Sequence, residues 1–231
     1  MSDVSEFKRR VARPLRVIGV ACGMGAADRR CEAGPDALRA AGLIERLRSR
    51  GLDAAWTETI RPEGTGPLDA VAGACEKLAE RVADTIQDRG LPVVLGGDHS
   101  CAIGTWKGAA QALAPNGPVG LLWIDAHMDA HTPQTTPTGA LHGMPLACLL
   151  GHGDPVVTAL ADDARIAPQH VCLIGVRSFE SGEAALLKRL GVRVYFMREV
   201  VRRGLDAVMR EALEIVQRGT AGFGVTIDLD A

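Results

Sequence analysis

Short apolar runs alternate along this chain with segments whose apolar residues recur at helical spacing. The strand-like runs are 15–21, 91–95, 119–124, 171–175, 192–197 and 222–227. The helical patterns cover 34–51, 68–90, 102–113, 183–190 and 205–218. Mostly apolar strands that alternate with helices are typical of a parallel sheet with helices on both faces. We therefore predict a three-layer α-β-α sandwich with a mostly parallel sheet, formed by residues 1–231 as one domain.

The composition limits the class of protein. The chain has 231 residues, of which 47% are apolar and 23% charged, as expected for a soluble globular domain. Its 26 Lys and Arg nearly balance its 28 Asp and Glu, so no field of one sign indicates a nucleic-acid or membrane partner. The first ten residues lack the apolar core of a signal peptide, and the six cysteines form no C-x-x-C pair. We expect a cytoplasmic protein with reduced thiols.

A dense polar segment, Asp-Ala-His-Met-Asp-Ala-His at 125–131, directly follows the apolar run 119–124. In an extended chain alternate residues point to the same side, so we expect Asp125, His127 and Asp129 to converge on one point. Such polar density at the end of a buried strand needs a reason beyond packing.

Two further apolar runs lead into polar segments, Gly96-Gly-Asp-His-Ser100 and Asp228-Leu-Asp230. Taken alone, the first could be a strand-to-helix turn capped by Asp98 or Ser100, and the second a solvated acidic segment. However, ligands of open α/β sheets bind beyond the carboxyl ends of the strands, and all three polar segments follow such ends.

If these strand ends are neighbours, four carboxylates and two imidazoles meet in one cleft. Such a set would repel or protonate unless cations neutralised it. Carboxylates with few imidazoles and no thiolate suit Mn²⁺ or Mg²⁺ better than structural zinc. Six ligands exceed the need of one ion, so we expect two ions that share bridging carboxylates. The predicted ligands are His99, Asp125, His127, Asp129, Asp228 and Asp230.

The three polar segments resemble the signature motifs of the arginase (ureohydrolase) family, which includes agmatinases and formiminoglutamases. Residues 32–39, 132–145 and 174–180 are also similar to segments of that family. The resemblance implies two Mn²⁺ per subunit, with Asp125 and Asp228 as bridges. It implies one ion held by His99, Asp125, Asp129 and Asp228, and the other by His127, Asp125, Asp228 and Asp230.

The resemblance also implies the reaction. A hydroxide that bridges the metals would attack the guanidinium carbon, and L-arginine would give L-ornithine and urea. Asp129 would accept the proton of the hydroxide. His142 resembles the proton-shuttling histidine of the family, a role that suits imidazole because its pKa lies near neutrality. His152 and His170 have no such support, and we treat them as structural.

The resemblance places the substrate contacts at His131, Thr138, Glu180 and Glu183. His131 and Ala140 stand where arginases usually have asparagine, and Glu180 replaces a shorter aspartate. L-Arginine is the leading candidate, and another guanidino compound, such as agmatine or guanidinobutyrate, is the alternative.

The chain ends one residue after Asp230, whereas family members continue with a further strand, helices and a glutamate that holds the guanidinium. The sequence therefore predicts a domain that is incomplete at its C-terminus, poorly active or inactive on L-arginine, and left with an apolar edge at 222–230. A non-catalytic relic that keeps the fold is the alternative in another functional class, and a single-zinc deacetylase is a remote third. The family suggests a homotrimer or homohexamer.

Overall fold

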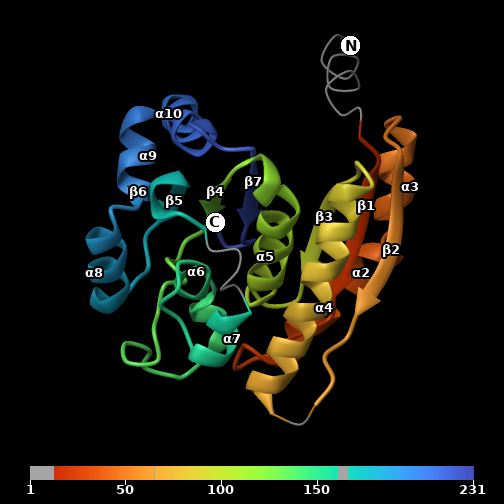
Figure 1. The fold of residues 1–231 in the computed structure, drawn as a ribbon, viewed down its shortest axis with the longest axis horizontal. Helices are drawn as coiled ribbons and strands as arrows, with labels where there is room; N and C mark the ends of the chain where they lie inside the picture. The colour runs from red at the N-terminus through yellow and green to blue at the C-terminus, as the bar shows by residue number, and fades with distance from the viewer. Residues whose placement is uncertain (1–12, 65, 161–165) are drawn as a thin grey trace. The chain divides into compact units, whose positions relative to one another are not determined.

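The structure is a computed structural model in which residues 13–64, 66–160 and 166–231 are described. The first ten residues, whose composition argues against a signal peptide, lie outside these ranges. The chain divides into two compact units, Met1–Gly108 and Ala109–Ala231, and each contains a parallel sheet with helices packed against it (Figure 1). No helix in the described ranges is long and apolar enough to cross a membrane.

The N-terminal unit contains a three-stranded sheet in the order β2-β1-β3. Its strands are β1 (Leu15–Val20), β2 (Ala54–Ile60) and β3 (Leu91–Gly96), and both pairings are parallel. The helices of this unit are η1 (Arg29–Ala33), α2 (Gly34–Ala40), α3 (Leu43–Ser49), α4 (Pro67–Gln87) and the first half of α5 (Cys101–Leu113). Val20 lies opposite Gly96, so the loop after β1 and the turn after β3 begin at the same level of the sheet.

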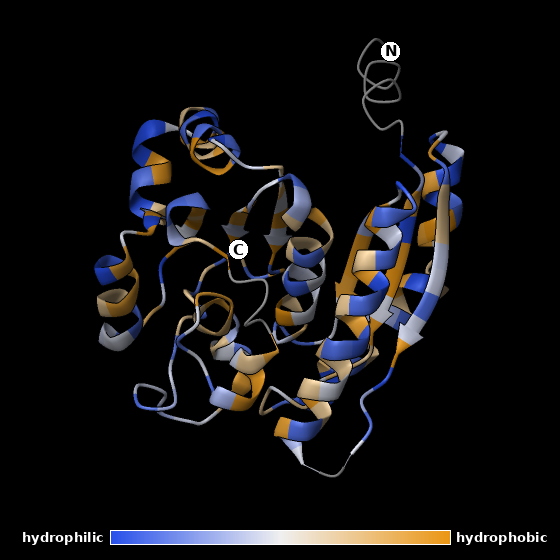
Figure 2. Cartoon of the chain, viewed as in Figure 1, coloured by the Kyte–Doolittle hydropathy of each residue, from blue (hydrophilic) through white to orange (hydrophobic). Residues whose placement is uncertain are grey.

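Helices cover both faces of this sheet, as neighbouring residues of β1 show. A Cβ atom added at Gly19 would lie 3.2 Å from Pro35 of α2, whereas Ile18 lies beside Arg81 and Thr85 of α4. Because successive residues of a strand point to opposite faces, α2 and α4 pack on opposite sides of the sheet. Helix α4 presents a stripe of buried apolar residues, and its ribbon in Figure 2 carries both hydrophobic and hydrophilic residues.

The C-terminal unit contains a four-stranded parallel sheet in the order β6-β5-β4-β7. The strands are β4 (Val119–Ile124), β5 (Val171–Val176), β6 (Arg193–Phe196) and β7 (Gly222–Ile227). The helices are α6 (Pro145–Leu149), α7 (Pro155–Ala159), α8 (Ser181–Leu190), α9 (Met197–Arg203) and α10 (Leu205–Gln217), with short 3₁₀ turns at η2 (Ala114–Asn116), η3 (Leu141–Gly143) and η5 (Pro168–His170). Ile124 lies opposite Ile227, so β4 and β7 end at the same level.

The core of this unit lies between α10 and the sheet. Leu122, Ile174 and Tyr195 from three strands pack against Val208, Ala212 and Val216 from α10. The helix backbone approaches β4 most closely at Gly120, where an added Cβ atom would lie 1.9 Å from the carbonyl oxygen of Val216. The other face of β4 carries Leu121 and Trp123, whose side chains are fully buried.

Substitution of Gly120 by alanine is expected to destabilise the protein, because the new methyl group would push α10 away from β4. Overpacking of this kind costs about 1–3 kcal/mol. Thermal unfolding should show a lower Tm than the wild type. Gly73→Ala is the matched control, because Gly73 lies in α4 with no atom within 4 Å of an added Cβ atom, and alanine favours the helix. A Gly120→Ala protein as stable as the Gly73→Ala protein would contradict this account.

The predicted elements differ from the observed ones in several places. The helix expected over 34–51 is divided into α2 and α3, because Gly42 adopts a left-handed conformation with φ of 79°. Strand β2 and helices α6, α7 and α9 were not predicted. β2 is an edge strand that carries Thr57, Glu58 and Thr59, so it lacks the continuous apolar run of the central strands.

Candidate metal centre

Asp125 lies directly after β4 and is the most deeply buried of the predicted ligands described in this unit, with 1% of its surface exposed. Both carboxylate oxygens accept hydrogen bonds. The indole Nε1 of Trp123 donates to Oδ2 at 3.0 Å, and the main-chain N–H of His127 donates to Oδ1 at 2.8 Å. The main-chain N–H of Asp125 donates to Ile174 of β5 at 3.0 Å. The carboxylate is therefore fixed in one orientation before any ion binds.

Asp230 reaches the same place from the turn after β7. Its Oδ2 lies 3.1 Å from Nδ1 of His127, which also lies 3.5 Å from Oδ1 of Asp125. Asp125, His127 and Asp230 each offer one ligand atom, and these atoms lie within 4.8 Å of one another. Asp228, at the end of β7, also has a carboxylate oxygen within that distance of Asp125. The predicted meeting of the β4 and β7 ends is therefore present in this unit.

Arg177 holds the last turn in place. Its guanidinium donates to the main-chain oxygen of Asp230, and its main-chain N–H donates to Ala126 at 2.8 Å. This arginine follows β5, so it joins the ends of three strands. Sequence reasoning gave no role to Arg177 or Trp123. The available signal was weak, because each acts through a contact that depends on the folded sheet.

The cause of the convergence differs from the prediction. β4 ends at Ile124, so residues 125–131 do not continue as a strand. Asp125 and His127 come together because the Asp125 carboxylate accepts the His127 N–H in a local turn. Asp129 adopts a left-handed conformation, with φ of 48°, and redirects the chain. Aspartate tolerates this conformation better than most residues, and such strain is common at functional sites. Its role as a ligand stays a prediction.

The residues present fit a divalent cation. Asp125, Asp228 and Asp230 supply oxygen ligands and His127 supplies one imidazole, with no thiolate among them. Such a donor set favours Mn²⁺ or Mg²⁺ over structural zinc.

His99 belongs to the N-terminal unit, in the turn between β3 and α5. Within that unit the turn is bound to the loop after β1, because Gly97 N–H donates to Val20 and Asp98 N–H donates to Cys22, both at 2.9 Å. His99 therefore has a fixed backbone. Its place among the metal ligands stays a prediction.

The long loop that carries His142 is closed at its base by two main-chain hydrogen bonds. His131 N–H donates to Gly143 at 2.9 Å, and Leu146 N–H donates to Asp129 at 2.9 Å. His142 lies in the 3₁₀ turn η3, beside this closure. The fold thus brings the predicted proton shuttle to the segment that contains Asp129, although 12 residues separate the two in sequence.

His131, Glu180 and Glu183 form a second cluster in the C-terminal unit. His131 Nε2 lies 2.9 Å from Glu180 and 3.4 Å from Glu183. Both oxygens of Glu183 accept main-chain N–H bonds at 3.0 Å, from Ala130 and from Glu180. Glu183 is 3% exposed, and this burial raises the pKa of its carboxyl group. Hydrogen bonds with Glu183 and His131 lower the pKa of Glu180.

Through these contacts Glu183 caps the start of α8. Glu180 is the exposed carboxylate of the cluster. The signal for this arrangement was present in the sequence, because glutamate at the third position of a helix often binds back to the N-cap N–H. Thr138 lies in the exposed loop, where its hydroxyl accepts the Ala140 N–H at 3.2 Å. The substrate contacts of His131, Thr138, Glu180 and Glu183 stay predictions.

Comparison with known proteins places this geometry in a family. The model of the Arginase family matches residues 13–231. The chain belongs to the arginase family. It is 40% identical over 230 residues to an arginase of Bacillus caldovelox, in a match that covers 94% of this chain and 76% of that relative. The family and the α/β sandwich predicted from the sequence are both confirmed.

Solved structures agree. The crystal structure of arginase from Bacillus subtilis matches with a TM-score of 0.88 and 39% identity, covering 94% of this chain and 75% of that one. Arginase from Entamoeba histolytica in complex with L-ornithine matches with a TM-score of 0.87 and 28% identity, with the same coverage. This arginase-family chain is a hydrolase, and its relatives from Bacillus caldovelox and Bacillus subtilis are both named arginase.

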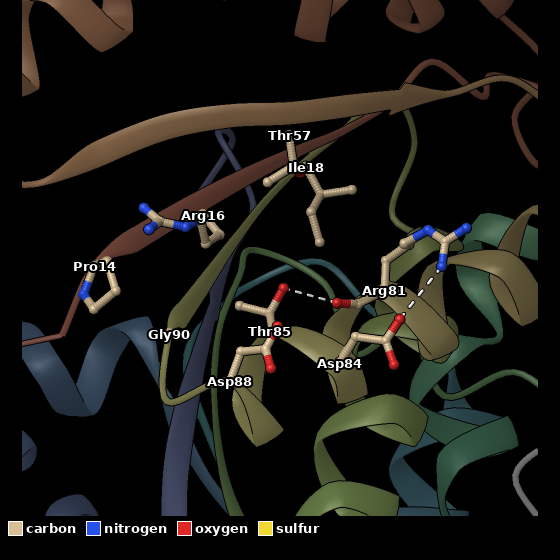
Figure 3. Close-up of a pocket in the computed structure, with 9 residues that line it drawn as sticks. All are labelled: Pro14, Arg16, Ile18, Thr57, Arg81, Asp84, Thr85, Asp88 and Gly90. Carbon is tan, nitrogen blue, oxygen red and sulfur yellow. Dashed lines mark hydrogen bonds and ion pairs between the residues drawn. The ribbon is translucent and has the colours of Figure 1, made fainter.

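A pocket of about 300 Å³ in the N-terminal unit of this arginase-family chain is lined by residues of β1, β2 and α4 and by the residues that precede β1 and β3 (Figure 3). Pro14 and Gly90, which line it, directly precede β1 and β3, so the pocket is at the amino ends of the strands. The motif residues follow the carboxyl ends. Arg81 in its wall donates to Glu58 at 2.7 Å and to Asp84 at 3.3 Å, so its charge is already paired. We assign this pocket no function.

Proposed function

We propose that this protein is a manganese-dependent ureohydrolase that converts L-arginine and water to L-ornithine and urea. The observation that carries the proposal is the buried Asp125 carboxylate, with His127 and Asp230 within ligand distance of it. The names of the relatives support the reaction, and the Entamoeba histolytica relative was solved with L-ornithine, the expected product.

Six residues would hold two ions in this proposal. Asp125 and Asp228 would serve both, His99 and Asp129 would complete one site, and His127 and Asp230 the other. When bound, such a pair of ions supplies an activated water at neutral pH and stabilises negative charge that develops on the substrate. The protein contributes the orientation of each carboxylate, as the two hydrogen bonds to Asp125 illustrate.

In this proposal two side chains, those of Asp129 and His142, transfer the proton. Hydrolysis adds water across the guanidinium C–N bond, so a proton from the water must reach the nitrogen of the departing amine. Asp129 is proposed to accept that proton, and His142 to exchange it with the amine and solvent. The closed base of the loop supports this pairing, because it holds η3 against the segment that contains Asp129.

The far end of the substrate is proposed to meet His131, Thr138, Glu180 and Glu183. Glu180 presents an exposed carboxylate, which suits the α-ammonium group of L-arginine. One observation favours a second candidate, agmatine. Agmatine has an amine and no carboxylate, and Ala140 offers no side-chain donor to a carboxylate.

The test is urea release by the Mn²⁺-loaded protein from L-arginine, agmatine and 4-guanidinobutyrate. We expect the highest kcat/KM with L-arginine and the lowest with 4-guanidinobutyrate, which lacks the amine that Glu180 would contact. A preference for agmatine would replace the first candidate by the second. Absence of urea from all three compounds, in protein that has bound two ions, would contradict the proposal.

We further propose a cytoplasmic homo-oligomer, a trimer or hexamer as the family suggests. Light scattering after size-exclusion chromatography should give a mass three or six times 24.3 kDa. A mass of one chain would contradict it.

A further inference from the structure

The Asp98 carboxylate in the turn after β3 is buried and accepts three hydrogen bonds. Its Oδ2 accepts the main-chain N–H of Gly25 at 2.9 Å, across 73 positions of sequence. Its Oδ1 accepts the main-chain N–H of Ser100 at 2.9 Å and also the Ser100 hydroxyl. Asp98 therefore binds the loop after β1 to Ser100, the residue directly before α5.

The backbone around Asp98 has no free space. A Cβ atom at Gly97 would lie 2.3 Å from the carbonyl oxygen of Cys22, and one at Gly25 would lie 2.9 Å from the Asp98 carboxylate. The two segments can approach this closely because both positions are glycine. Asp98 N–H also donates to Cys22 at 2.9 Å, so the loop and the turn are joined by both main chain and side chain.

Ser100 is fixed from a third direction. It is 1% exposed, and its carbonyl oxygen accepts the Cys75 thiol of α4 at 3.3 Å. The residue between Asp98 and Ser100 is His99. Both neighbours of His99 are thus held in place, which leaves its backbone no freedom to move.

We propose that Asp98 is a positioning residue that fixes the backbone of His99 for metal binding, an inference that rests on the proposed role of His99 as a ligand. The three groups that contact the Asp98 carboxylate are all hydrogen-bond donors, so both side-chain oxygens at position 98 must act as acceptors. Asparagine has the same shape but presents an NH₂ group on one side, which would face an N–H donor. Asp98→Asn is therefore the sharpest test, because it changes donor pattern with little change in volume.

In a titration with buffered Mn²⁺, Asp98→Asn is expected to lower the affinity for one of the two ions by roughly 10–100-fold, the usual effect of changing a group that orients a ligand. In metal-free protein, hydrogen exchange at the Gly25 and Ser100 amides should become faster. Two controls separate position from stability. Asp28→Asn changes an exposed aspartate that accepts the Arg30 N–H at the same spacing. Val82→Ala leaves a cavity in the core under α4. Both should bind two ions as the wild type does.

Wild-type affinity for both ions in Asp98→Asn would overturn the proposal, and so would an equal loss in Val82→Ala. The hydrogen-exchange measurement is made on metal-free protein, so its result does not depend on whether the protein binds Mn²⁺. Wild-type protein that binds no Mn²⁺ would refute the proposed function, and unchanged exchange at Gly25 and Ser100 would refute the role of Asp98 separately.

Discussion

Asp125→Ala protein is expected to hold neither Mn²⁺ ion and to release urea at no more than the background rate. In the proposed centre Asp125 contributes to both ions, and its carboxylate is already oriented by Trp123 and by the His127 N–H. Bound metal would lower the pKa of water to near neutrality, so its loss would remove the nucleophile at neutral pH. We expect a fall in kcat/KM of roughly 10⁴-fold or more.

Metal analysis of the dialysed, Mn²⁺-reconstituted protein checks this expectation, with urea release as the second readout. Asp230→Ala should show a graded result, one ion in place of two, because Asp230 is proposed to serve a single site. Asp154→Ala is the control. Asp154 caps α7 by accepting the Val156 N–H at 2.9 Å, so its loss costs about 0.5–2 kcal/mol of stability without touching the centre. Two ions in Asp125→Ala protein would show that Asp125 is not a bridge.

Much of this site could be predicted because it depends on strand ends. The apolar run 119–124 is β4, the run 222–227 is β7, and the two strands pair in parallel from Val119 opposite Gly222 to Ile124 opposite Ile227. Equal register at their ends places Asp125 and Asp228 side by side. A sequence pattern is sufficient here, because both strands are recognisable as short apolar runs and the polar residues follow each run directly.

The remainder depends on contacts that no local pattern contains. The Arg177 bond to Asp230 spans 53 positions and forms only when β5 and β7 lie in one sheet. Alternation of residues along 125–131 predicted an extended chain, and it gives no sign that Asp129 adopts a left-handed backbone conformation. The expected helix over 34–51 contained Gly42, whose positive φ turns the chain between α2 and α3. In each case a tertiary contact or a single backbone angle overrides the periodic signal.

The apolar edge expected at 222–230 corresponds to β7, an edge strand of the four-stranded sheet in the described part of the C-terminal unit. Phe223, Val225 and Ile227 alternate along it as exposed large apolar side chains. Exposed apolar edges favour association with other strands.

His142→Ala is expected to reduce kcat by about 10²–10⁴-fold while two Mn²⁺ ions stay bound, because general acid–base groups contribute on that scale. His142 is proposed to move a proton to the departing amine, and none of the six proposed ligands is altered. KM should change little, since the imidazole is not proposed to hold the guanidinium. The loop should keep its place, because its closure at His131 and Leu146 is made by the main chain.

The measurements are steady-state urea release and bound manganese, with His152→Ala as the matched control. His152 is an exposed histidine of the same unit, and its replacement should leave kcat unchanged. Added imidazole should restore part of the rate to His142→Ala protein, because a small base can replace the missing proton carrier, and this rescue separates proton transfer from a packing defect. A wild-type kcat in His142→Ala protein would remove His142 from the reaction, and loss of manganese would place it in the metal centre.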